Sequence, residues 1–305
     1  MDSISIAIGT VKILLPSIDF SLNESLKDHT SFKIGGPARV MFFPKTSDEF
    51  VEIFSLLDKH DIAPLIIGNG TNILADDSKP LDIAVIKTTG ISAAELTGES
   101  EITAGAGISL MKLAQFAYEH GLAGLEFTYG IPGTLGGAAS MNAGAYGGEM
   151  SDVIYSTNAF AKGSGLYAIT GDEHDFSYRH SRFSDKSDIV LSAVIRLQKG
   201  EEKNIKAKMD ELIGRRRESQ PLDIPSAGST FKRPKDGYAA SLIERAGLKG
   251  FTIGGAQVSQ KHSGFIVNTG GATYEDVIAI IEHVKETVYK RFGIELEPEI
   301  KIIRS

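Results

Sequence analysis

The stretch from Gly121 to Gly148 combines many glycines with almost no charge. It holds nine of the chain's 33 glycines, and its only charged residue is Glu126. Glycine loses more backbone entropy on folding than other residues, so this density indicates tight turns with positive φ, or backbone that approaches a phosphate or a flat ring. The run IPGTLGGAA at 131–139 would let successive N–H groups point at an anion. A pair of glycine-rich loops between short strands explains this stretch alone equally well.

A second glycine loop, GNGTN at 68–72, directly follows a predicted buried strand at 64–67. The spacing of Gly68 and Gly70 suggests the dinucleotide-binding fingerprint, but Ile73 stands where its third glycine would be. We therefore reject a Rossmann-type site. The loop's N–H groups and its threonine and asparagine side chains could instead hold a phosphate, although a plain turn is the simpler interpretation of this loop alone.

Length and composition narrow the class of protein. A chain of 305 residues predicts two domains, or one with a large insertion, and 42% hydrophobic with 23% charged residues is typical of a soluble globular protein. The net charge of −7 argues against a nucleic-acid partner, which would need a basic face. The absence of cysteine excludes disulfides, thiolate metal sites and a cysteine nucleophile, and it fits a reducing compartment.

Two features of the chain bear on where it works. No apolar run reaches the roughly 18 residues that a membrane helix needs, so we expect no membrane partner. The N-terminus does not resemble a signal peptide, because Asp2 is acidic and Lys12 interrupts the apolar segment. The sequence therefore predicts a cytoplasmic protein, and no motif in it calls for a metal.

Capping residues and apolar stripes predict the helices that position these loops. Thr46 and Glu49 form a capping box in front of an apolar stripe at helical spacing. Ser109 caps a helix that Gly121 ends, and Thr273 caps a long one. One helix is predicted to begin at Thr46, and another to end in the basic run 215–217. Further helices are predicted at 109–120, 239–246 and 273–292.

Between the helices, short apolar runs predict strands. The polar segment 198–204 is a plausible domain boundary, residues 1–20 read as strand-like or irregular, and 155–178 has no clear pattern. Strands are predicted at 39–43, 64–67, 82–88, 101–104, 188–197, 264–268 and 299–303.

Eight stretches stand in a fixed order and cover the chain from about residue 25 onward. They are HTSFKIGGPA (29–38), IIGNGTNIL (66–74), GLEFTYGIPGTLGGAASMNAGAYGGE (124–149), YRHSRF (178–183), QPLDIPSAGSTFKRP (220–234), AGLKG (246–250), GGAQVSQKHSGFIVN (254–268) and ELEPEIKII (295–303). Each one is weak by itself, but together they are similar to the UDP-N-acetylenolpyruvoylglucosamine reductases, flavin enzymes of peptidoglycan precursor synthesis. Thr71 stands where the family more often has serine, and the run 232–234 resembles the shorter subclass that lacks a tyrosine-bearing insertion.

The resemblance implies an α+β fold with a two-subdomain FAD-binding part of the vanillyl-alcohol-oxidase type and a C-terminal α+β substrate domain. The first subdomain would comprise 1–88 with the C-terminal strand 294–305, the second 89–200, and the substrate domain 201–293. FAD would be bound tightly and non-covalently, and NADPH would be a co-substrate that reduces it and leaves. The partners implied are NADPH and a UDP-sugar, and we expect a monomer.

The resemblance also places the site residues. The two glycine loops would cradle the FAD pyrophosphate through backbone N–H groups. The residues implied for this role are Gly68, Asn69, Gly70, Thr71, Asn72, Gly133, Thr134, Gly136, Gly137 and Ala138. The residues implied for substrate binding are Tyr178, Arg215, Lys232 and His262.

Three residues match the family's catalytic positions. Arg179 would bind the substrate carboxylate, where charge builds up in the transition state. Ser229 would donate a proton to the carbon beside that carboxylate, with a cation such as Lys232 easing the alkoxide. Glu299 would share the developing charge or relay a proton. Each has a simpler interpretation when taken alone. Arg179 could form a surface ion pair or stack, Ser229 could be an ordinary turn serine, and Glu299 could be an exposed glutamate at a strand start.

Two other functions remain open from the sequence. One is a flavin oxidase or dehydrogenase of the same superfamily, in which a covalent flavin link would have to use histidine because cysteine is absent. The other is a nucleotide-binding module that kept the loops and lost the chemistry. The joint presence of Arg179, Ser229 and Glu299 counts against that module.

Overall fold

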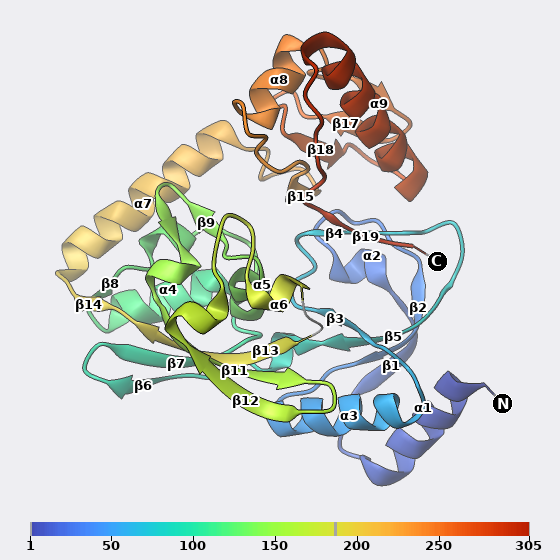
Figure 1. Ribbon diagram of the computed structural model, residues 1–305, viewed down its shortest axis with the longest axis vertical. Helices are drawn as coiled ribbons and strands as arrows, with labels where there is room; N and C mark the ends of the chain where they lie inside the picture. Colours follow the sequence, from blue (N-terminus) through green and yellow to red (C-terminus); the bar gives the residue numbers. More distant parts are fainter. Residues whose placement is uncertain (1, 186–187, 305) are drawn as a thin grey trace. The chain divides into compact units, whose positions relative to one another are not determined.

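The computed structural model describes residues 2–185 and 188–304, and the chain forms two compact units (Figure 1). Unit 1 consists of Met1–Ser21, Val40–Asn69 and Ile83–Arg216. Unit 2 consists of Leu22–Arg39, Gly70–Asp82 and Arg217–Ser305. Both mix helices with mainly antiparallel strands, which confirms the predicted α+β class.

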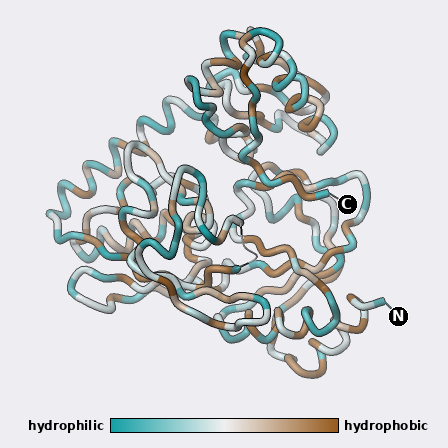
Figure 2. The backbone as a smooth tube through the Cα atoms, in the orientation of Figure 1, coloured by the Kyte–Doolittle hydropathy of each residue, from teal (hydrophilic) through white to brown (hydrophobic). Residues whose placement is uncertain are grey.

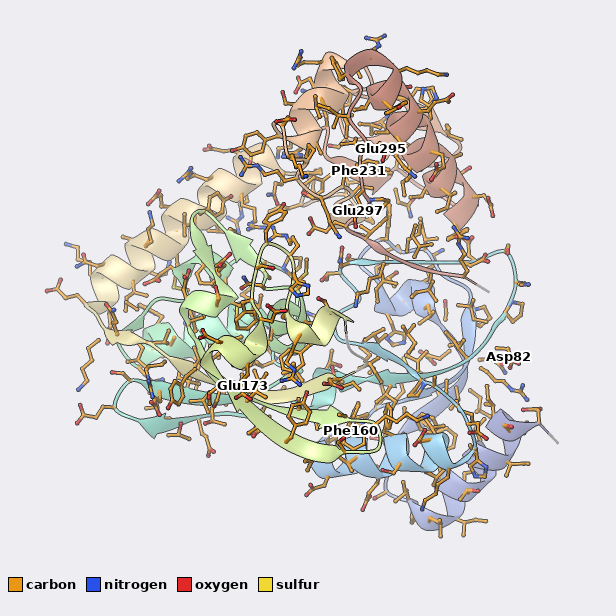
Figure 3. All side chains as sticks on the ribbon, in the orientation of Figure 1. Asp82, Phe160, Glu173, Phe231, Glu295 and Glu297 are labelled. Carbon is orange, nitrogen blue, oxygen red and sulfur yellow. The ribbon has the colours of Figure 1, made fainter. Side chains whose placement is uncertain are left out.

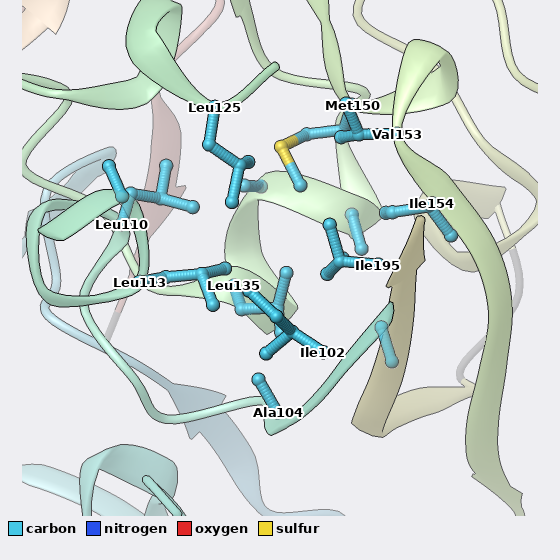
Figure 4. Packing of buried hydrophobic residues seen from close by; sticks show 14 of the residues in the cluster. Ile102, Ala104, Leu110, Leu113, Leu125, Leu135, Met150, Val153, Ile154 and Ile195 are labelled. Atoms are coloured by element: carbon cyan, nitrogen blue, oxygen red, sulfur yellow. The ribbon is translucent and has the colours of Figure 1, made fainter. Parts of the chain in front are cut away.

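A five-stranded antiparallel sheet dominates unit 1. Its order is β12-β11-β13-β7-β6, and α4 (Leu110–Glu119) and α5 (Leu135–Ser140) pack on it. Figure 4 shows this core, in which Leu125 and Leu135 from the glycine-rich stretch, and Met150 just after it, pack with residues of the sheet. This packing holds the glycine-rich stretch against the sheet. The strands are β6 (Ala94–Gly98), β7 (Glu101–Gly105), β11 (Ile154–Ala161), β12 (Gly165–Thr170) and β13 (Ile189–Arg196).

The segment 155–178, which has no clear pattern in the sequence, contains the hairpin of β11 and β12. β12 is the outer strand of its sheet and most of its residues are exposed or half-buried. Its residues Leu166, Tyr167, Ala168 and Ile169 are an apolar run without alternation, and only Ile169 of β12 is buried. An edge strand of this kind has no continuous apolar face, so its hydrophobic alternation is too weak to be recognised.

The N-terminal segment also differs from its prediction, since α1 (Ser3–Leu14) is a helix. The Oδ1 atom of Asp2 accepts a hydrogen bond from the Ser5 N–H at 3.0 Å and caps it. Ile4, Ala7 and Val11 are buried at helical spacing in a second core of unit 1. The β-branched isoleucines suggested a strand, and packing against the rest of the unit overrode that preference.

The second core of unit 1 surrounds α3 (Ser47–Lys59). The hydroxyl of Thr46 caps α3 by accepting from the Glu49 N–H at 3.1 Å. The Glu49 carboxylate accepts from the Lys45 N–H and not from the N-cap, so only half of the predicted capping box forms. Phe160 from β11 meets Phe54 edge-on with ring centroids 5.0 Å apart, beside α3 in Figure 3.

Unit 2 is built on an antiparallel sheet of order β15-β18-β17-β16. Its core combines this sheet with α8 (Ala239–Arg245) and α9 (Tyr274–Phe292). Hydrophobic and hydrophilic residues alternate along α9 in Figure 2, and the predicted capping box of Thr273 and Asp276 forms in both directions. The strands are β15 (Ser226–Ser229), β16 (Thr252–Ile253), β17 (Ala256–Val258) and β18 (Phe265–Asn268).

The remaining helices and strands complete the chain. A four-stranded sheet has the order β1-β2-β5-β3, with β3 parallel to β5, and β4 pairs in parallel with β19. No helix among residues 2–185 and 188–304 is long and apolar enough to cross a membrane. These elements are β1 (Phe20–Ser25), α2 (Leu26–His29), β2 (Pro37–Phe42), β3 (Leu65–Ile67), β4 (Ile73–Ala75), β5 (Leu81–Lys87), β8 (Leu122–Ala123), β9 (Gly144–Ala145), β10 (Gly148–Glu149), α6 (Arg182–Asp185), β14 (Gln198–Lys199), α7 (Glu202–Ser219) and β19 (Lys301–Ile303).

Candidate functional site

The two glycine loops meet inside unit 1. A Cβ atom on Gly68 would lie 2.3 Å from the hydroxyl oxygen of buried Thr134, so no larger residue fits without a shift. The side-chain amide of Asn69 donates to the carbonyl of Pro132 at 2.8 Å. The start of the first loop is therefore held directly against the second, as a cofactor site formed by both loops would require.

Several N–H groups of the second loop already have backbone partners. The Leu135 and Gly136 N–H groups donate to the carbonyls of Ile108 and Ala106 at 2.9 and 2.8 Å. The Ala138 N–H donates to the Thr134 carbonyl at 2.9 Å, and its methyl group is buried in the core. These hydrogen bonds fix the loop, so an anion would have to be bound by the remaining N–H groups of the loop.

Gly137 is the most accessible glycine of this loop. It is exposed, and a Cβ atom there would meet only the Thr134 hydroxyl, at 3.6 Å. The carbonyl of Gly133 accepts from the Leu110 N–H at 3.1 Å, which ties the start of the loop to α4. The loop thus offers open backbone at Gly137 on a well-anchored frame.

The first loop continues into unit 2 with Gly70, whose φ of 62° lies in the left-handed region. A Cβ atom on Gly70 would lie 2.1 Å from the His29 carbonyl oxygen, so only glycine fits. The Asn72 side-chain amide donates to the Glu299 carbonyl at 3.1 Å, and Thr71 beside it is half-buried. Unit 2 therefore brings a predicted cofactor residue against a predicted catalytic one.

Tyr178 and Arg179 are the two central residues of a tight turn in unit 1. The N–H groups and carbonyls of Ser177 and His180 bond to each other at 3.1 Å, which closes the turn. Arg179 has a φ of 54°, a conformation that costs a residue with a side chain about 1 kcal/mol or more. Its guanidinium donates to the Gly144 carbonyl at 3.3 Å and lies 5.2 Å from the ring centroid of Tyr178, which is exposed.

Ser229 and Glu299 lie on neighbouring backbone segments of unit 2. The Glu299 N–H donates to the Thr230 carbonyl at 2.8 Å, so a hydrogen bond joins Glu299 to the residue after Ser229. Ser229 ends β15 and is exposed, while Glu299 is half-buried just before β19. The simpler reading of Glu299 as an exposed strand start does not describe its environment.

Lys232 and His262 also belong to unit 2. The Lys232 N–H donates to the Glu297 carbonyl at 2.9 Å, and its ammonium forms an ion pair with the Glu297 carboxylate. Figure 3 labels Glu297 close to Phe231, the residue that joins Lys232 to Thr230. Burial lowers the pKa of His262, whose Nδ1 atom accepts from the Gly264 N–H at 3.2 Å.

The three arginines at the end of α7 differ in their exposure to solvent. Arg215 and Arg217 are exposed, and Arg215 pairs with Glu211 at 3.5 Å. Arg216 is buried, with its guanidinium 5.5 Å from the ring centroid of Tyr146, and burial lowers its pKa. Residue type alone does not distinguish Arg216 from its neighbours in the basic run 215–217. Its spacing did carry a signal, because it continues the buried stripe Ile205, Met209 and Leu212.

No group of three or more histidine, aspartate or glutamate side chains that could hold a metal occurs among the described residues.

Comparison with known proteins defines the class of protein to which the chain belongs. Residues 38–167 match the family of FAD binding domains, and residues 220–303 match the C-terminal domain of UDP-N-acetylenolpyruvoylglucosamine reductase. The chain is therefore an oxidoreductase with an FAD-binding domain.

The chain belongs to the UDP-N-acetylenolpyruvoylglucosamine reductase family, which confirms the resemblance found in the sequence. It is 49% identical over 298 residues to the UDP-N-acetylenolpyruvoylglucosamine reductase of Caldanaerobacter subterraneus subsp. tengcongensis, covering 98% of each chain. The crystal structure of UDP-N-acetylenolpyruvylglucosamine reductase from Thermus caldophilus matches with a TM-score of 0.79 and 32% identity, over 94% of this chain and 98% of that one. A structure of alkyldihydroxyacetonephosphate synthase, at 16% identity and a TM-score of 0.50, covers 64% of this chain and 40% of its own and shares the fold alone.

Proposed function

We propose that this chain reduces the enolpyruvyl ether of UDP-N-acetylglucosamine to UDP-N-acetylmuramate in peptidoglycan precursor synthesis. Family membership along the chain supports the reaction. The observation that carries the chemistry is the pairing in unit 2, where the Glu299 N–H donates to the Thr230 carbonyl and keeps Glu299 beside the segment of Ser229.

The residues present fit an FAD pyrophosphate. Gly68 has no room for a side chain against Thr134, and Gly137 offers open backbone. We assign cofactor binding to Gly68, Asn69, Gly70, Thr71, Asn72, Gly133, Thr134, Gly136, Gly137 and Ala138, with Gly136 and Ala138 acting through shape because their N–H groups are engaged. When bound and reduced by NADPH, FAD would supply the hydride for the terminal carbon of the enolpyruvyl group.

The chain's own residues then bind the substrate and supply the proton. Arg179 binds the carboxylate of the enolpyruvyl group, where negative charge grows as the terminal carbon gains its hydride. Ser229 donates its hydroxyl proton to the carbon beside that carboxylate, which completes the lactyl ether. Glu299 stabilises this charge shift or returns a proton to the serine oxygen. We assign substrate contacts to Tyr178, Arg215, Lys232 and His262, and the ion pair of Lys232 with Glu297 would have to open for a direct contact.

Several finer points belong to the same proposal. The chain would act as a monomer in the cytoplasm and bind neither nucleic acid nor membrane. It would be of the shorter subclass, use NADPH as its reductant and hold FAD without a covalent bond. The three-part division at 1–88 with 294–305, 89–200 and 201–293 remains a prediction.

The first test is an oxygen-free titration followed by visible absorption. Flavin bands that bleach with NADPH and return with the enolpyruvyl sugar nucleotide would support cofactor, reductant and substrate together. Bands that bleach and do not return would move the function to a flavin oxidase or dehydrogenase with another substrate. A protein that cannot take up FAD would overturn the proposal.

Substitution of the proposed proton donor gives a sharper test. Ser229→Ala should leave reduction of the flavin by NADPH intact and slow its reoxidation by substrate by roughly 100-fold or more, since general acid catalysis contributes that much. Stopped-flow absorbance measures both steps. Ser241→Ala, an exposed serine of α8 in the same unit, is the control and should change neither. Reoxidation at the native rate in Ser229→Ala would remove Ser229 from the mechanism.

A further inference from the structure

Three side chains fasten the glycine-rich stretch of unit 1 to the turn that carries Arg179. The Ser181 hydroxyl donates to the Ser140 carbonyl at 2.7 Å, and the Asn142 side-chain amide donates to the Ser177 carbonyl at 3.2 Å. The Arg179 guanidinium donates to the Gly144 carbonyl at 3.3 Å. The cofactor loop and the proposed carboxylate-binding arginine thus share one hydrogen-bonded frame, in which Asn142 is the central member.

Asn142 is fully buried and uses both ends of its amide. Its Oδ1 atom accepts from the Ser151 N–H at 2.9 Å, while its Nδ2 group donates to the Ser177 carbonyl. These partners fix the orientation of the amide, because a backbone N–H can only donate and a carbonyl can only accept. A short side chain with one donor and one acceptor is needed, which asparagine supplies.

The backbone at Asn142 also requires an unusual residue. Its φ is 43°, in the left-handed region that asparagine tolerates better than other residues with a side chain. The turn it holds is strained as well, since Arg179 has a φ of 54°. Such a conformation persists only where the surrounding structure over-determines it. The bond from Asn142 to the Ser177 carbonyl acts directly at the closing pair of that turn.

We infer that Asn142 is a positioning residue that holds the turn of Tyr178 and Arg179 in register with the cofactor loop. It acts through Arg179 and does not touch the substrate. Because the inference rests on the proposed role of Arg179, a test must separate a failure of Asn142 from a failure of Arg179.

The test compares Asn142→Asp with Arg179→Ala and with the double variant. Asn142→Asp keeps the shape and the acceptor for Ser151 and replaces the donor that faces Ser177. We expect flavin reoxidation by substrate to slow about 10-fold, while FAD content and reduction by NADPH stay within about twofold, as for an interaction that matters only for substrate turnover. In the Arg179→Ala background the same change should cost nothing further, because residues acting through one another are not additive.

Two further variants keep the test decisive. Asn142→Gly relaxes the backbone and removes both contacts, so it replaces Asn142→Asp if the buried carboxylate prevents folding. Asn23→Asp is the matched control, because Asn23 also has a positive φ, of 52°, but is exposed on β1, and it should behave as the native protein. Hydrogen exchange supplies a readout without turnover, and amides 177–181 should exchange faster in the Asn142 variants alone.

The outcomes are distinct. Normal reoxidation in Asn142→Asp, with slow reoxidation in Arg179→Ala, overturns the inference and leaves the proposed function intact. Equal slowing of both half-reactions, additive losses in the double variant, or unchanged exchange at 177–181 also overturns it, since a general structural role would produce them. Normal reoxidation in Arg179→Ala overturns the proposed role of Arg179, and the positioning role falls with it.

Discussion

The turn of Arg179 in unit 1 and the segments of Ser229 and Glu299 in unit 2 are held in different ways. Side chains anchor the turn, since Asn142 and Ser181 donate to backbone carbonyls and Arg179 itself reaches the Gly144 carbonyl. The other segments are held mainly by main-chain bonds: the Thr230 N–H donates to the Gly264 carbonyl and the Thr230 carbonyl accepts from the Glu299 N–H, each at 2.8 Å. One side chain adds to them, since the Asn72 amide donates to the Glu299 carbonyl at 3.1 Å.

This difference predicts how substitutions will act. A main-chain bond survives a change of side chain, so substitutions near Ser229 should mainly affect stability. A bond made by a side chain disappears with that side chain, so substitutions near Arg179 should affect substrate turnover. Each of the following variants tests one side of this contrast.

The largest effect is expected at Arg179. Arg179→Lys keeps the positive charge and loses the planar fork that binds a carboxylate through two hydrogen bonds. It also loses the donor to the Gly144 carbonyl. We expect flavin reoxidation by substrate to slow by about 100-fold or more, a loss of roughly 3 kcal/mol of transition-state stabilisation. Stopped-flow absorbance measures the step.

Arg196→Lys is the matched control for Arg179→Lys. Arg196 lies in the same unit, stacked 3.5 Å from the ring centroid of Tyr155 and paired with Glu101, and none of these three has a proposed role in the reaction. It should turn over as the native protein does. Unchanged turnover in Arg179→Lys would assign the carboxylate to another arginine, of which Arg215 is the first candidate.

Thr230→Val tests whether main-chain bonds keep Ser229 and Glu299 in place when a nearby side-chain bond is lost. The buried Thr230 hydroxyl accepts from the Ile266 N–H at 3.2 Å, and valine has the same shape without that acceptor. We expect a loss of about 1–3 kcal/mol in the free energy of unfolding, because a buried N–H loses its partner. Reoxidation should stay within about twofold, since the main-chain bonds that place Ser229 and Glu299 remain.

Urea denaturation and stopped-flow absorbance measure these two quantities for Thr230→Val. Thr252→Val is the control, because the Thr252 hydroxyl bonds to the Gly250 carbonyl at an exposed position and its loss should cost little. Slow reoxidation in Thr230→Val without loss of stability would contradict the contrast between the two units.

The sequence predicted local structure and motif residues better than it predicted their support. Ser109 and Thr273 cap their helices as expected, because a capping bond depends only on residues three apart. The segment of α1 was misread, since its helical form depends on burial of Ile4, Ala7 and Val11 against distant residues.

The candidate site shows the same limit. Gly68 and Gly70 were recognised because glycine density has few explanations, and the structure shows close neighbours at both. Asn142 was not recognised, because its partner Ser177 lies 35 positions away in the sequence and a tertiary hydrogen bond of this kind leaves no periodic signal. Arg216 was missed although it continues the buried stripe of α7, because a charged residue is not expected in a stripe of otherwise apolar residues.

The smallest expected effect concerns His174, which precedes the Tyr178 turn in unit 1. It is buried, stacked on Phe176 with ring centroids 4.8 Å apart, and bonded to the Gly171 carbonyl at 2.9 Å. Burial, the largest cause, lowers its pKa, and the charge of Arg182 acts in the same direction. The folded protein therefore keeps this imidazole neutral at a pH where the unfolded chain binds a proton.

The sign of the pH dependence follows from that difference. The contribution of His174 to stability is fully present above its unfolded pKa, about 6.5, and is lost as the pH falls from there through the lowered folded pKa, by at most about 1.4 kcal/mol per pH unit. Urea denaturation between about pH 7 and 5 measures the slope. His174→Gln should flatten it, while His262→Gln should remove a separate share because burial lowers that pKa too. Parallel curves for the native protein and His174→Gln would show that His174 does not contribute to the pH dependence of stability.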